Sequence, residues 1–370
     1  MFSEGTGVTD RERGGKMVNV GVIGSGYWGV KHIRNFHELA EANLRMVCDL
    51  EEERLFQVRR QYPYASTTSN LGDLFTDEVD AVVVATPVSS HYRLAREALL
   101  HGKHVLVEKP LTASSRQASE LIELADKRDL VLMSGHTYEY HPAVDFLRDY
   151  VRSGQLGDVF YIDADRLNLG LFRPDVNVLW DLAPHDICIV LSLIGQDPIS
   201  VSARGSSCID PTVYDVAYME LKFPGDILAH IHVSWLDPCK VRNITVVGSK
   251  KMVVYDDVSD AEKIRIYDKG VAIKADDDEF GTWPPRYRHG DVTIPFISSA
   301  EPLKLECSHF LQCIRDGVNP RSDGWAGLRV VSILEAANKS LVNGGRREDL
   351  MPVSEIVRGV APRPAEVTYQ

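Results

Sequence analysis

The sequence predicts an α/β protein in which a doubly wound parallel sheet precedes a C-terminal α/β domain built on a large, mainly antiparallel open sheet. The chain has 370 residues, more than the roughly 100 to 200 residues of one ordinary domain. Residues 18–135 alternate short β-branched runs with helical stretches, the pattern of a parallel sheet covered by helices on both faces. After residue 138 strands follow one another across short turns, which is typical of an antiparallel sheet.

Domain boundaries follow from these changes of pattern. Residues 1–16 are polar, carry charges of both signs and lack the apolar core of a secretory signal, so we expect a disordered leader. We expect the first domain over residues 17–137, the second over residues 138–350, and a C-terminal tail over residues 351–370.

The elements of the first domain are recognised by their periodicity. Five compact apolar runs, bounded by polar or turn residues, predict strands: 18–23, 44–49, 79–85, 104–108 and 130–134. The segments between them carry apolar residues at spacings of three and four, which predicts helices with one buried face: 31–42, 51–61, 90–101 and 114–127.

The second domain reads as a helix, a run of strands and two closing helices. The predicted helices cover residues 144–152, a stretch that begins at Pro184, 303–316 and 326–343. The predicted strands cover 159–166, 217–223, 227–235, 244–247, 252–255 and 264–267. Residues 276–294 are charged and rich in turn residues, so we expect a loop there.

Composition excludes several classes of protein. No apolar run reaches the roughly 18 residues of a membrane helix, and the formal net charge of −12 repels polyanions, so neither a membrane nor a nucleic acid is an expected partner. The six cysteines form no CxxC pair and no metal-ligand pattern. They predict reduced thiols, no bound metal and a cytoplasmic location.

A glycine motif follows the first strand and opens the first helix. It reads Gly24-Ser25-Gly26-Tyr27-Trp28-Gly29, the fingerprint of a dinucleotide-binding Rossmann fold when strand, turn and helix occur in this order. The first glycine permits the tight turn, the second lets backbone amides approach a pyrophosphate, and the third lets the helix pack against the strand.

An acid stands 20 residues after Gly29, at the end of the second predicted strand. This residue, Asp49, can accept hydrogen bonds from both hydroxyls of an adenosine ribose. Its charge repels a 2′-phosphate, so we predict NAD rather than NADP. The alternative is a solvated acid at a strand end.

Two further strand ends carry candidate ligand contacts. The third strand ends at Thr86-Pro87, with His91 close behind, where a ribose and nicotinamide lie in such folds. The fourth ends at Glu108-Lys109, where Glu108 can bond a cofactor ribose and Lys109 can contact the cofactor and donate to a substrate oxygen. A cis peptide bond at Pro110 would re-aim the lysine. The alternative for Lys109 is an ordinary salt-bridged lysine after a strand.

A second candidate group lies in the C-terminal half. Asp181 and His185 are four residues apart, so a helix places them on one face, with Pro184 tolerated in its first turn. A helix N-terminus lowers the pKa of a histidine, and neutral imidazole is the form a general base requires. His185 is therefore the acid/base candidate, although such pairs also serve as caps or structural hydrogen bonds.

Together these motifs resemble the Gfo/Idh/MocA oxidoreductases over residues 17–350. The resemblance rests on the glycine motif with Asp49, the tripeptide at residues 108–110, Gly135-His136, and Asp181 with His185. Residues 27–37 and 180–186 look most like UDP-N-acetylglucosaminuronate 3-dehydrogenase-like members. One departure is residues 173–178, which lack the glycine-rich stretch that precedes the Asp-His pair in many members.

The resemblance implies a function and an assembly. It implies reversible hydride transfer between NAD and a ring secondary alcohol, at carbon 3, of a sugar or nucleotide sugar. Lys109, Asp181 and His185 are then the catalytic residues, and the second domain binds substrate and forms a homodimer or homotetramer through its open sheet. Alternatives are a keto-deoxysugar reductase, a cyclitol dehydrogenase and a non-catalytic dinucleotide sensor.

Further substrate contacts are expected around this triad. Tyr138 and His141 follow Gly135-His136, where family members contact cofactor and substrate, or they simply begin a helix. Three arginines are able to bind a substrate carboxylate or diphosphate through charge-assisted hydrogen bonds, although some are expected to be surface charges: Arg166, Arg173 and Arg242.

Overall fold

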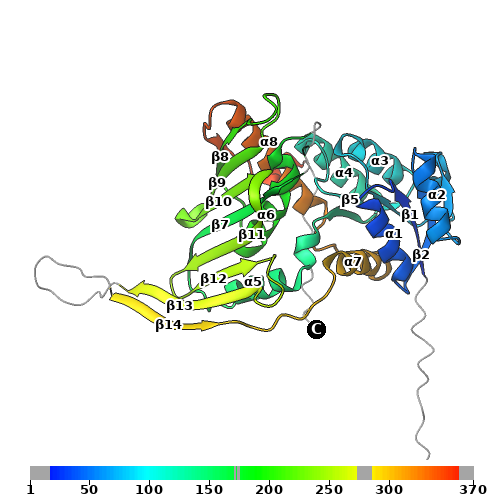
Figure 1. Cartoon of the computed structure of the whole chain (residues 1–370). Helices are drawn as coiled ribbons and strands as arrows, with labels where there is room; N and C mark the ends of the chain where they lie inside the picture. The colour runs from blue at the N-terminus through cyan, green and yellow to red at the C-terminus, as the bar shows by residue number, and fades with distance from the viewer. Residues whose placement is uncertain (1–16, 171, 173–175, 273–285, 358–370) are drawn as a thin grey trace, which may run out of the picture.

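The computed structural model describes residues 17–170, 172, 176–272 and 286–357, and it contains two sheets side by side (Figure 1). The first sheet has six parallel strands in the order β3-β2-β1-β4-β5-β6. They are β1 (Val18–Ile23), β2 (Ala42–Cys48), β3 (Ser66–Thr68), β4 (Ala81–Val84), β5 (His104–Glu108) and β6 (Leu132–Gly135). The strand order reverses between β1 and β4, which is where open α/β sheets bind ligands at the carboxyl ends of their strands.

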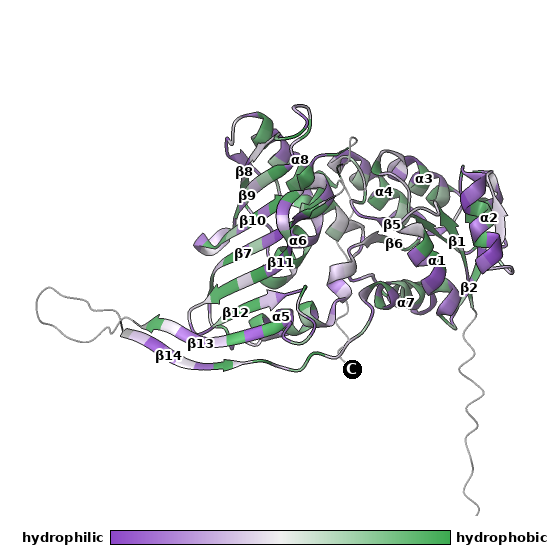
Figure 2. Ribbon diagram, in the orientation of Figure 1, coloured by the Kyte–Doolittle hydropathy of each residue, from purple (hydrophilic) through white to green (hydrophobic). Residues whose placement is uncertain are grey.

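The five strands and four helices predicted for this domain are present, and the doubly wound parallel sheet is confirmed. The helices are α1 (Gly29–Glu38), α2 (Glu52–Gln61), α3 (Val88–Leu100) and α4 (Ser115–Lys127). Sequence inspection missed β3, because its three residues Ser-Thr-Thr carry no apolar pattern. Figure 2 shows hydrophobic residues along the central strands, whereas the outlying α2 is largely hydrophilic and buries only Leu55 and Val58.

The second sheet has nine strands in the order β14-β13-β12-β11-β7-β10-β9-β8-β15. Its strands are β7 (Val159–Leu169), β8 (Ser200–Ser206), β9 (Val216–Lys222), β10 (Leu228–Ser234), β11 (Leu236–Gly248), β12 (Met252–Asp256), β13 (Ile264–Ala272), β14 (Arg286–Thr293) and β15 (Glu348–Asp349). Only β7 and β10 pair in parallel, so the mainly antiparallel sheet is confirmed.

The expectation of a loop over residues 276–294 is wrong for its second half. Residues 286–293 form β14, which pairs with β13 in a hairpin that projects from the body of the molecule (Figure 1). Its sequence, Arg-Tyr-Arg-His-Gly-Asp-Val-Thr, has no apolar alternation because a projecting hairpin has little core to face. The first half of the predicted loop, up to residue 285, lies outside the described residues, as do residues 1–16 and 358–370.

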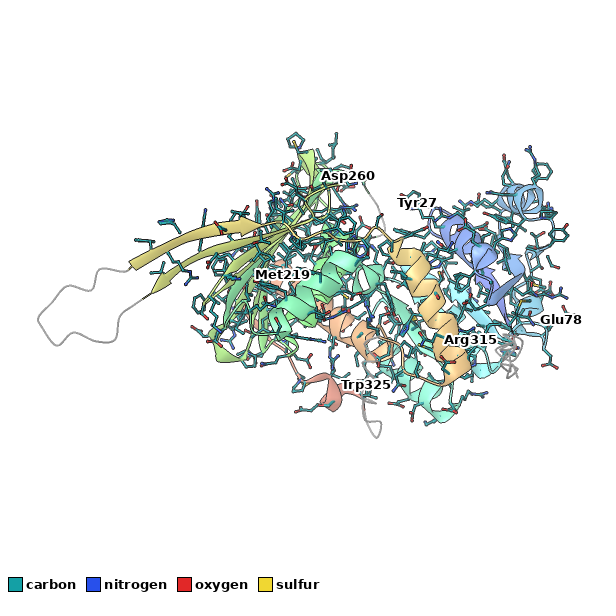
Figure 3. The ribbon with its side chains drawn as sticks, turned by 90° about the horizontal axis from the view of Figure 1, so that it is seen from below. Tyr27, Glu78, Met219, Asp260, Arg315 and Trp325 are labelled. Atoms are coloured by element: carbon teal, nitrogen blue, oxygen red, sulfur yellow. The ribbon has the colours of Figure 1, made fainter. Side chains whose placement is uncertain are left out.

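Helices join the two sheets. The nine-stranded sheet packs on α5 (Pro142–Arg152), α6 (Val178–Ile194) and α8 (Gly324–Val342). The same α8 also contributes Trp325, Leu328 and Val331 to the core of the parallel sheet. α7 (Pro302–Asp316) runs alongside α1 and buries Phe310 against Phe36 (Figure 3). The short α9 (Val353–Ile356) packs Val353 on the core of the parallel sheet, so part of the expected tail is ordered.

α6 begins earlier than the sequence suggested. Asn177 caps it by accepting a hydrogen bond from the Trp180 amide, and Pro184 lies inside the helix instead of in its first turn. The error came from treating proline as the start of the helix; one lost backbone hydrogen bond is outweighed here by the apolar packing of the surrounding turns. None of the helices within the described part of the chain combines the length and the apolar character that a bilayer crossing requires.

Candidate active site

The glycine turn joins β1 to α1 and has the geometry of a dinucleotide cradle. Gly24 has φ +92°, a left-handed conformation that favours glycine. A Cβ on Gly29 would lie 1.9 Å from the Gly24 carbonyl oxygen, so this position tolerates no side chain. Beside Gly26, by contrast, a Cβ would meet only Arg54 Nη1, at 3.7 Å. The turn therefore leaves space beside Gly26 at the start of α1, and a helix N-terminus with such space fits the pyrophosphate of NAD.

Asp49 lies directly behind this turn, at the end of β2. Its carboxylate accepts hydrogen bonds from the Ser25 amide at 2.7 Å, the Ser25 hydroxyl at 2.8 Å and the Glu51 amide at 2.9 Å. Burial opposes ionisation, but the hydrogen bonds from Glu51 and Ser25 prevail and lower the pKa of Asp49. Arg54 Nη1 lies 3.8 Å away. The acid is thus a charged part of the cradle, as an adenosine ribose partner should be.

Replacing Gly26 by alanine separates folding from cofactor binding. The added methyl group has room in the free protein, because only the end of a flexible arginine lies near it. It would occupy the space that a pyrophosphate approaches, so we expect the Kd for NAD to rise by about tenfold or more, a loss of about 1.4 kcal/mol per factor of ten, with an unchanged melting temperature. Calorimetric titration with NAD and thermal unfolding measure the two quantities. Unaltered NAD affinity would contradict the cradle.

Asp49 offers a test of cofactor preference. In Asp49→Ser the repulsion of a 2′-phosphate is removed and the neighbouring Arg54 becomes available to pair with it. We expect the ratio of NAD to NADP affinity to fall by about tenfold or more, as measured by titration with each dinucleotide. In the matched double variant Asp49→Ser/Arg54→Gln the gain for NADP should vanish. Equal affinity of the parent protein for both cofactors would refute the assignment.

The other predicted cofactor contacts have different surroundings. Tyr27 is exposed and Trp28 half-buried, and the Lys31 ammonium lies 4.0 Å and 4.2 Å from the centres of their rings. Thr86 and the exposed Pro87 follow β4 beside Gly24, whose Cβ would come within 2.9 Å of the Thr86 methyl group. His91 is buried, and its ring nitrogens contact the carbonyl oxygens of Pro110 and Thr86 at 2.9 and 2.7 Å. It joins two strand-end loops.

Lys109 and Asp181 meet across the two domains. The Lys109 ammonium donates to the Asp181 carbonyl oxygen at 2.6 Å and lies 3.8 Å from its carboxylate. Trp235 Nε1 donates to the other carboxylate oxygen at 3.1 Å. Lys109 follows the buried Glu108 at the end of β5, and the Lys109-Pro110 peptide bond is cis, which agrees with one interpretation of the sequence. A charged pair thus stands at the carboxyl edge of the parallel sheet.

His185 lies one turn further along α6. Its ring centre is 5.0 Å from that of Tyr138, and its Nδ1 is buried with no hydrogen-bond partner among the described residues. Burial is the main cause that holds the pKa of His185 well below its usual value, and the positive charges of Lys109 and Arg166 add to it. The neutral imidazole expected from the sequence is supported, but the cause differs. His185 is the eighth residue of α6, beyond the first turn where the helix dipole acts.

Tyr138 connects His185 to two arginines. Its hydroxyl donates to Asp257 at 2.8 Å and accepts hydrogen bonds from Arg166 and Arg242, each at 3.1 Å. Arg166 is buried and binds both carboxylate oxygens of Asp186, at 2.7 and 2.8 Å. Arg166 is therefore a support for Tyr138 rather than a surface charge.

The two remaining arginines differ. Arg242 has 37% of its side chain exposed and pairs with Asp257 at 3.2 Å. Arg173 lies outside the described residues.

Sequence inspection missed four members of this region: His32, His136, Trp235 and Asp257. His136, at the end of β6, is buried, and within the described residues neither ring nitrogen has a hydrogen-bond partner. Burial lowers the pKa of His136 to about 4, so its imidazole is neutral. The dipeptide Gly135-His136 was the signal for His136, because it follows a predicted strand. No local pattern marks Trp235 or Asp257.

Fold and site together define a class. A cradle for NAD, with a lysine, an acid and a neutral histidine gathered near it, belongs to an NAD-dependent oxidoreductase acting on a CH-OH group. Residues 18–136 match the model of the oxidoreductase family with an NAD-binding Rossmann fold, and residues 144–254 match the GFO/IDH/MocA C-terminal domain. An uncharacterized oxidoreductase of Synechocystis is 32% identical over 277 residues, 64% of this chain and 73% of that protein. The chain belongs to the Gfo/Idh/MocA family.

Characterised relatives act on sugars and cyclitols. UDP-N-acetylglucosamine 3-dehydrogenase of Acidithiobacillus ferrooxidans is 29% identical over 85% of this chain and 94% of its own length. A solved structure of that enzyme superposes with a TM-score of 0.73, covering 88% of this chain and 97% of that chain at 27% identity. Myo-inositol 2-dehydrogenase of Thermotoga maritima is 25% identical over 88% of this chain and 96% of its length.

Proposed function

We propose that this protein oxidises, reversibly, the secondary alcohol at ring carbon 3 of a nucleotide sugar, with NAD as hydride acceptor and His185 as acid/base. The observation that carries the proposal is the contact between Lys109 on the cofactor domain and Asp181 on α6, one turn from the neutral His185. These groups surround the end of β5. This strand pairs with β4, at whose end a ribose and nicotinamide lie when a dinucleotide occupies the cradle. The relatives that act on nucleotide sugars and cyclitols support the substrate class.

Each residue has a part in this chemistry. Bound NAD supplies the acceptor for the hydride. The neutral His185 takes the hydroxyl proton as the carbonyl forms, and returns it in the reverse direction. The Lys109 ammonium donates to the same oxygen and stabilises its developing negative charge. Asp181, held by Trp235 and Lys109, orients that lysine and accepts a hydrogen bond from a neighbouring hydroxyl of the sugar.

Basic residues on β11 favour a nucleotide sugar over a free sugar. The pKa of Tyr27 is lowered first by its hydrogen bond and charge contact with Lys31, and also by the charges of Arg242 and Lys240. The charged groups of Arg242 and Lys240 therefore lie near enough to Tyr27 to act on its hydroxyl. A substrate diphosphate bound close to these residues would meet their positive charges despite the negative charge of the whole chain.

A substrate panel tests the proposal. The protein is mixed with NAD and with UDP-sugars, free hexoses, cyclitols and, in reverse, keto-deoxysugars with NADH, while the absorbance of the reduced cofactor is followed. With a UDP-sugar deuterated at carbon 3 we expect the deuterium in the NADH, detected by mass spectrometry. Turnover restricted to free cyclitols, or transfer of deuterium from another ring carbon only, would refute the assignment.

A further inference from the structure

A buried histidine on the cofactor helix contacts the acid that precedes the catalytic lysine. His32 lies on α1, one turn after the glycine turn, and has no exposed surface. Its Nε2 lies 2.8 Å from Glu108 Oε1, although 76 residues separate the two in sequence. The other oxygen of Glu108 accepts the Lys109 amide at 3.1 Å. His32 therefore connects the helix that faces the pyrophosphate to the strand end that carries Lys109.

The opposite ring nitrogen of His32 meets a thiol from α7. Cys307 Sγ lies 3.6 Å from His32 Nδ1, and Cys307 is wholly buried. Burial raises the pKa of Cys307 far above its usual value, so the sulfur keeps its proton and acts as a donor. A thiol donating to Nδ1 leaves the proton of a neutral ring on Nε2, where it points at Glu108.

This arrangement decides which of two buried acids carries the charge. Glu306 accepts a hydrogen bond from the Thr137 hydroxyl at 2.9 Å. Burial and the charge of Glu108 raise the pKa of Glu306 well above its usual value. Burial also disfavours ionisation of Glu108, but the hydrogen bond from His32 and the charge of Lys109 lower its pKa overall. Two neighbouring acids in different environments are thereby separated into one neutral and one ionised group.

We propose that His32, oriented by Cys307, is a positioning residue. It holds the Glu108 carboxylate in the orientation that binds the dinucleotide. Glu108 is the group expected to accept a ribose hydroxyl of NAD, so the inference rests on the cofactor half of the proposed function and not on the identity of the sugar. Without the imidazole, a carboxyl group at this buried position takes up a proton and turns away from Lys109. α7, which belongs to the C-terminal half of the chain, then acts on the cofactor site through its thiol.

The test measures NAD binding in the absence of any sugar. His32→Leu removes the donor, whereas His32→Gln places an amide N–H near the position of Nε2. We expect the Kd for NAD to rise about tenfold or more in His32→Leu, because hydrogen bonds to charged groups are among the stronger ones, and to stay within about twofold in His32→Gln. Cys307→Ser should bind NAD with the parental Kd, and the Kd of Cys307→Ala should fall between those of the parent and His32→Leu. Ile33→Ala, which empties an equally buried position on α1 without touching Glu108, controls for lost stability.

A double-mutant cycle distinguishes positioning from a purely structural role. In a Glu108→Gln background there is no carboxylate to hold, so His32→Leu should change the Kd for NAD no further. Equal losses in both backgrounds, or an unchanged Kd in His32→Leu, would overturn the proposal. So would equal losses in His32→Leu and Ile33→Ala. Because only NAD is titrated, an incorrect sugar assignment would leave all these outcomes unaffected, and failure of the parent to bind NAD would instead refute the cofactor site.

Discussion

Replacing His185 by glutamine should lower kcat by about 10² to 10⁴-fold, the usual contribution of a general acid/base, while the Kd for NAD stays at the parental value. Glutamine preserves much of the volume and hydrogen-bonding capacity of the side chain but cannot accept the hydroxyl proton. The measurement is steady-state turnover of the substrate found in the panel, together with calorimetric titration of NAD. His230→Gln, the same change on a half-exposed side chain of β10, is the matched control and should leave kcat unchanged.

The pH profile gives an independent measure of the same residue. Because burial and the charges of Lys109 and Arg166 hold the pKa of His185 well below 6.5, the imidazole stays neutral as the pH falls through 6.5. Alcohol oxidation should therefore lose activity only at a pH below that value, once the folded-state pKa is reached. Parental turnover in His185→Gln, or an acidic limb centred above pH 6.5, would contradict the assignment of His185 as the base.

Arg166→Met should reduce the free energy of unfolding by about 3 to 5 kcal/mol, the cost of leaving one partner of a buried ion pair uncompensated. Arg166 and Asp186 have side chains only 5% and 1% exposed, and two hydrogen bonds of 2.7 and 2.8 Å join them. Methionine fills part of the volume but leaves the carboxylate of Asp186 in a low-dielectric core. Urea unfolding followed by circular dichroism measures the loss.

Two companion variants make this prediction sharp. Arg166→Met/Asp186→Leu removes both charges and should recover most of the lost stability, because the buried carboxylate is gone. Arg242→Met removes a half-exposed arginine from the same tyrosine and should cost far less, because solvent screens exposed pairs. A double variant no more stable than Arg166→Met, or equal losses in Arg166→Met and Arg242→Met, would show that the buried pair is not the source of the effect.

Local patterns predicted most of the first domain because the information there is local. The glycine turn needs specific backbone conformations within six consecutive residues. On either side of it, β1 is a compact apolar run and α1 carries apolar residues at spacings of three to four. In the second domain the same reasoning failed where a strand has no run of large apolar residues. β14 is charged along its length, and β8 (Ser-Val-Ser-Ala-Arg-Gly-Ser) alternates small and polar residues, so neither stands out from a loop.

Candidate site residues were predictable to the extent that they end a predicted strand or lie on a predicted helix. Lys109 and Asp181 were both proposed from their local setting, and the fold places them in contact. The reason given for a neutral His185 was incorrect because Pro184 is not at the start of α6. Burial beside Tyr138, which no local pattern encodes, is the main cause that lowers the pKa of that histidine.

The sequence by itself determined the parallel α/β domain and the glycine turn with its acid, because turn conformations and periodicity depend on residues close together in the chain. It also determined which residue types are present for hydride transfer: a lysine, an acid and a histidine. Only the tertiary structure decided which charges meet. Tyr138 and Asp257 are 119 residues apart, and His32 and Cys307 are 275 apart, yet each pair is in contact. Such pairs form when sheets and helices pack, since packing alone sets the distances and the burial that make one acid ionised and another neutral.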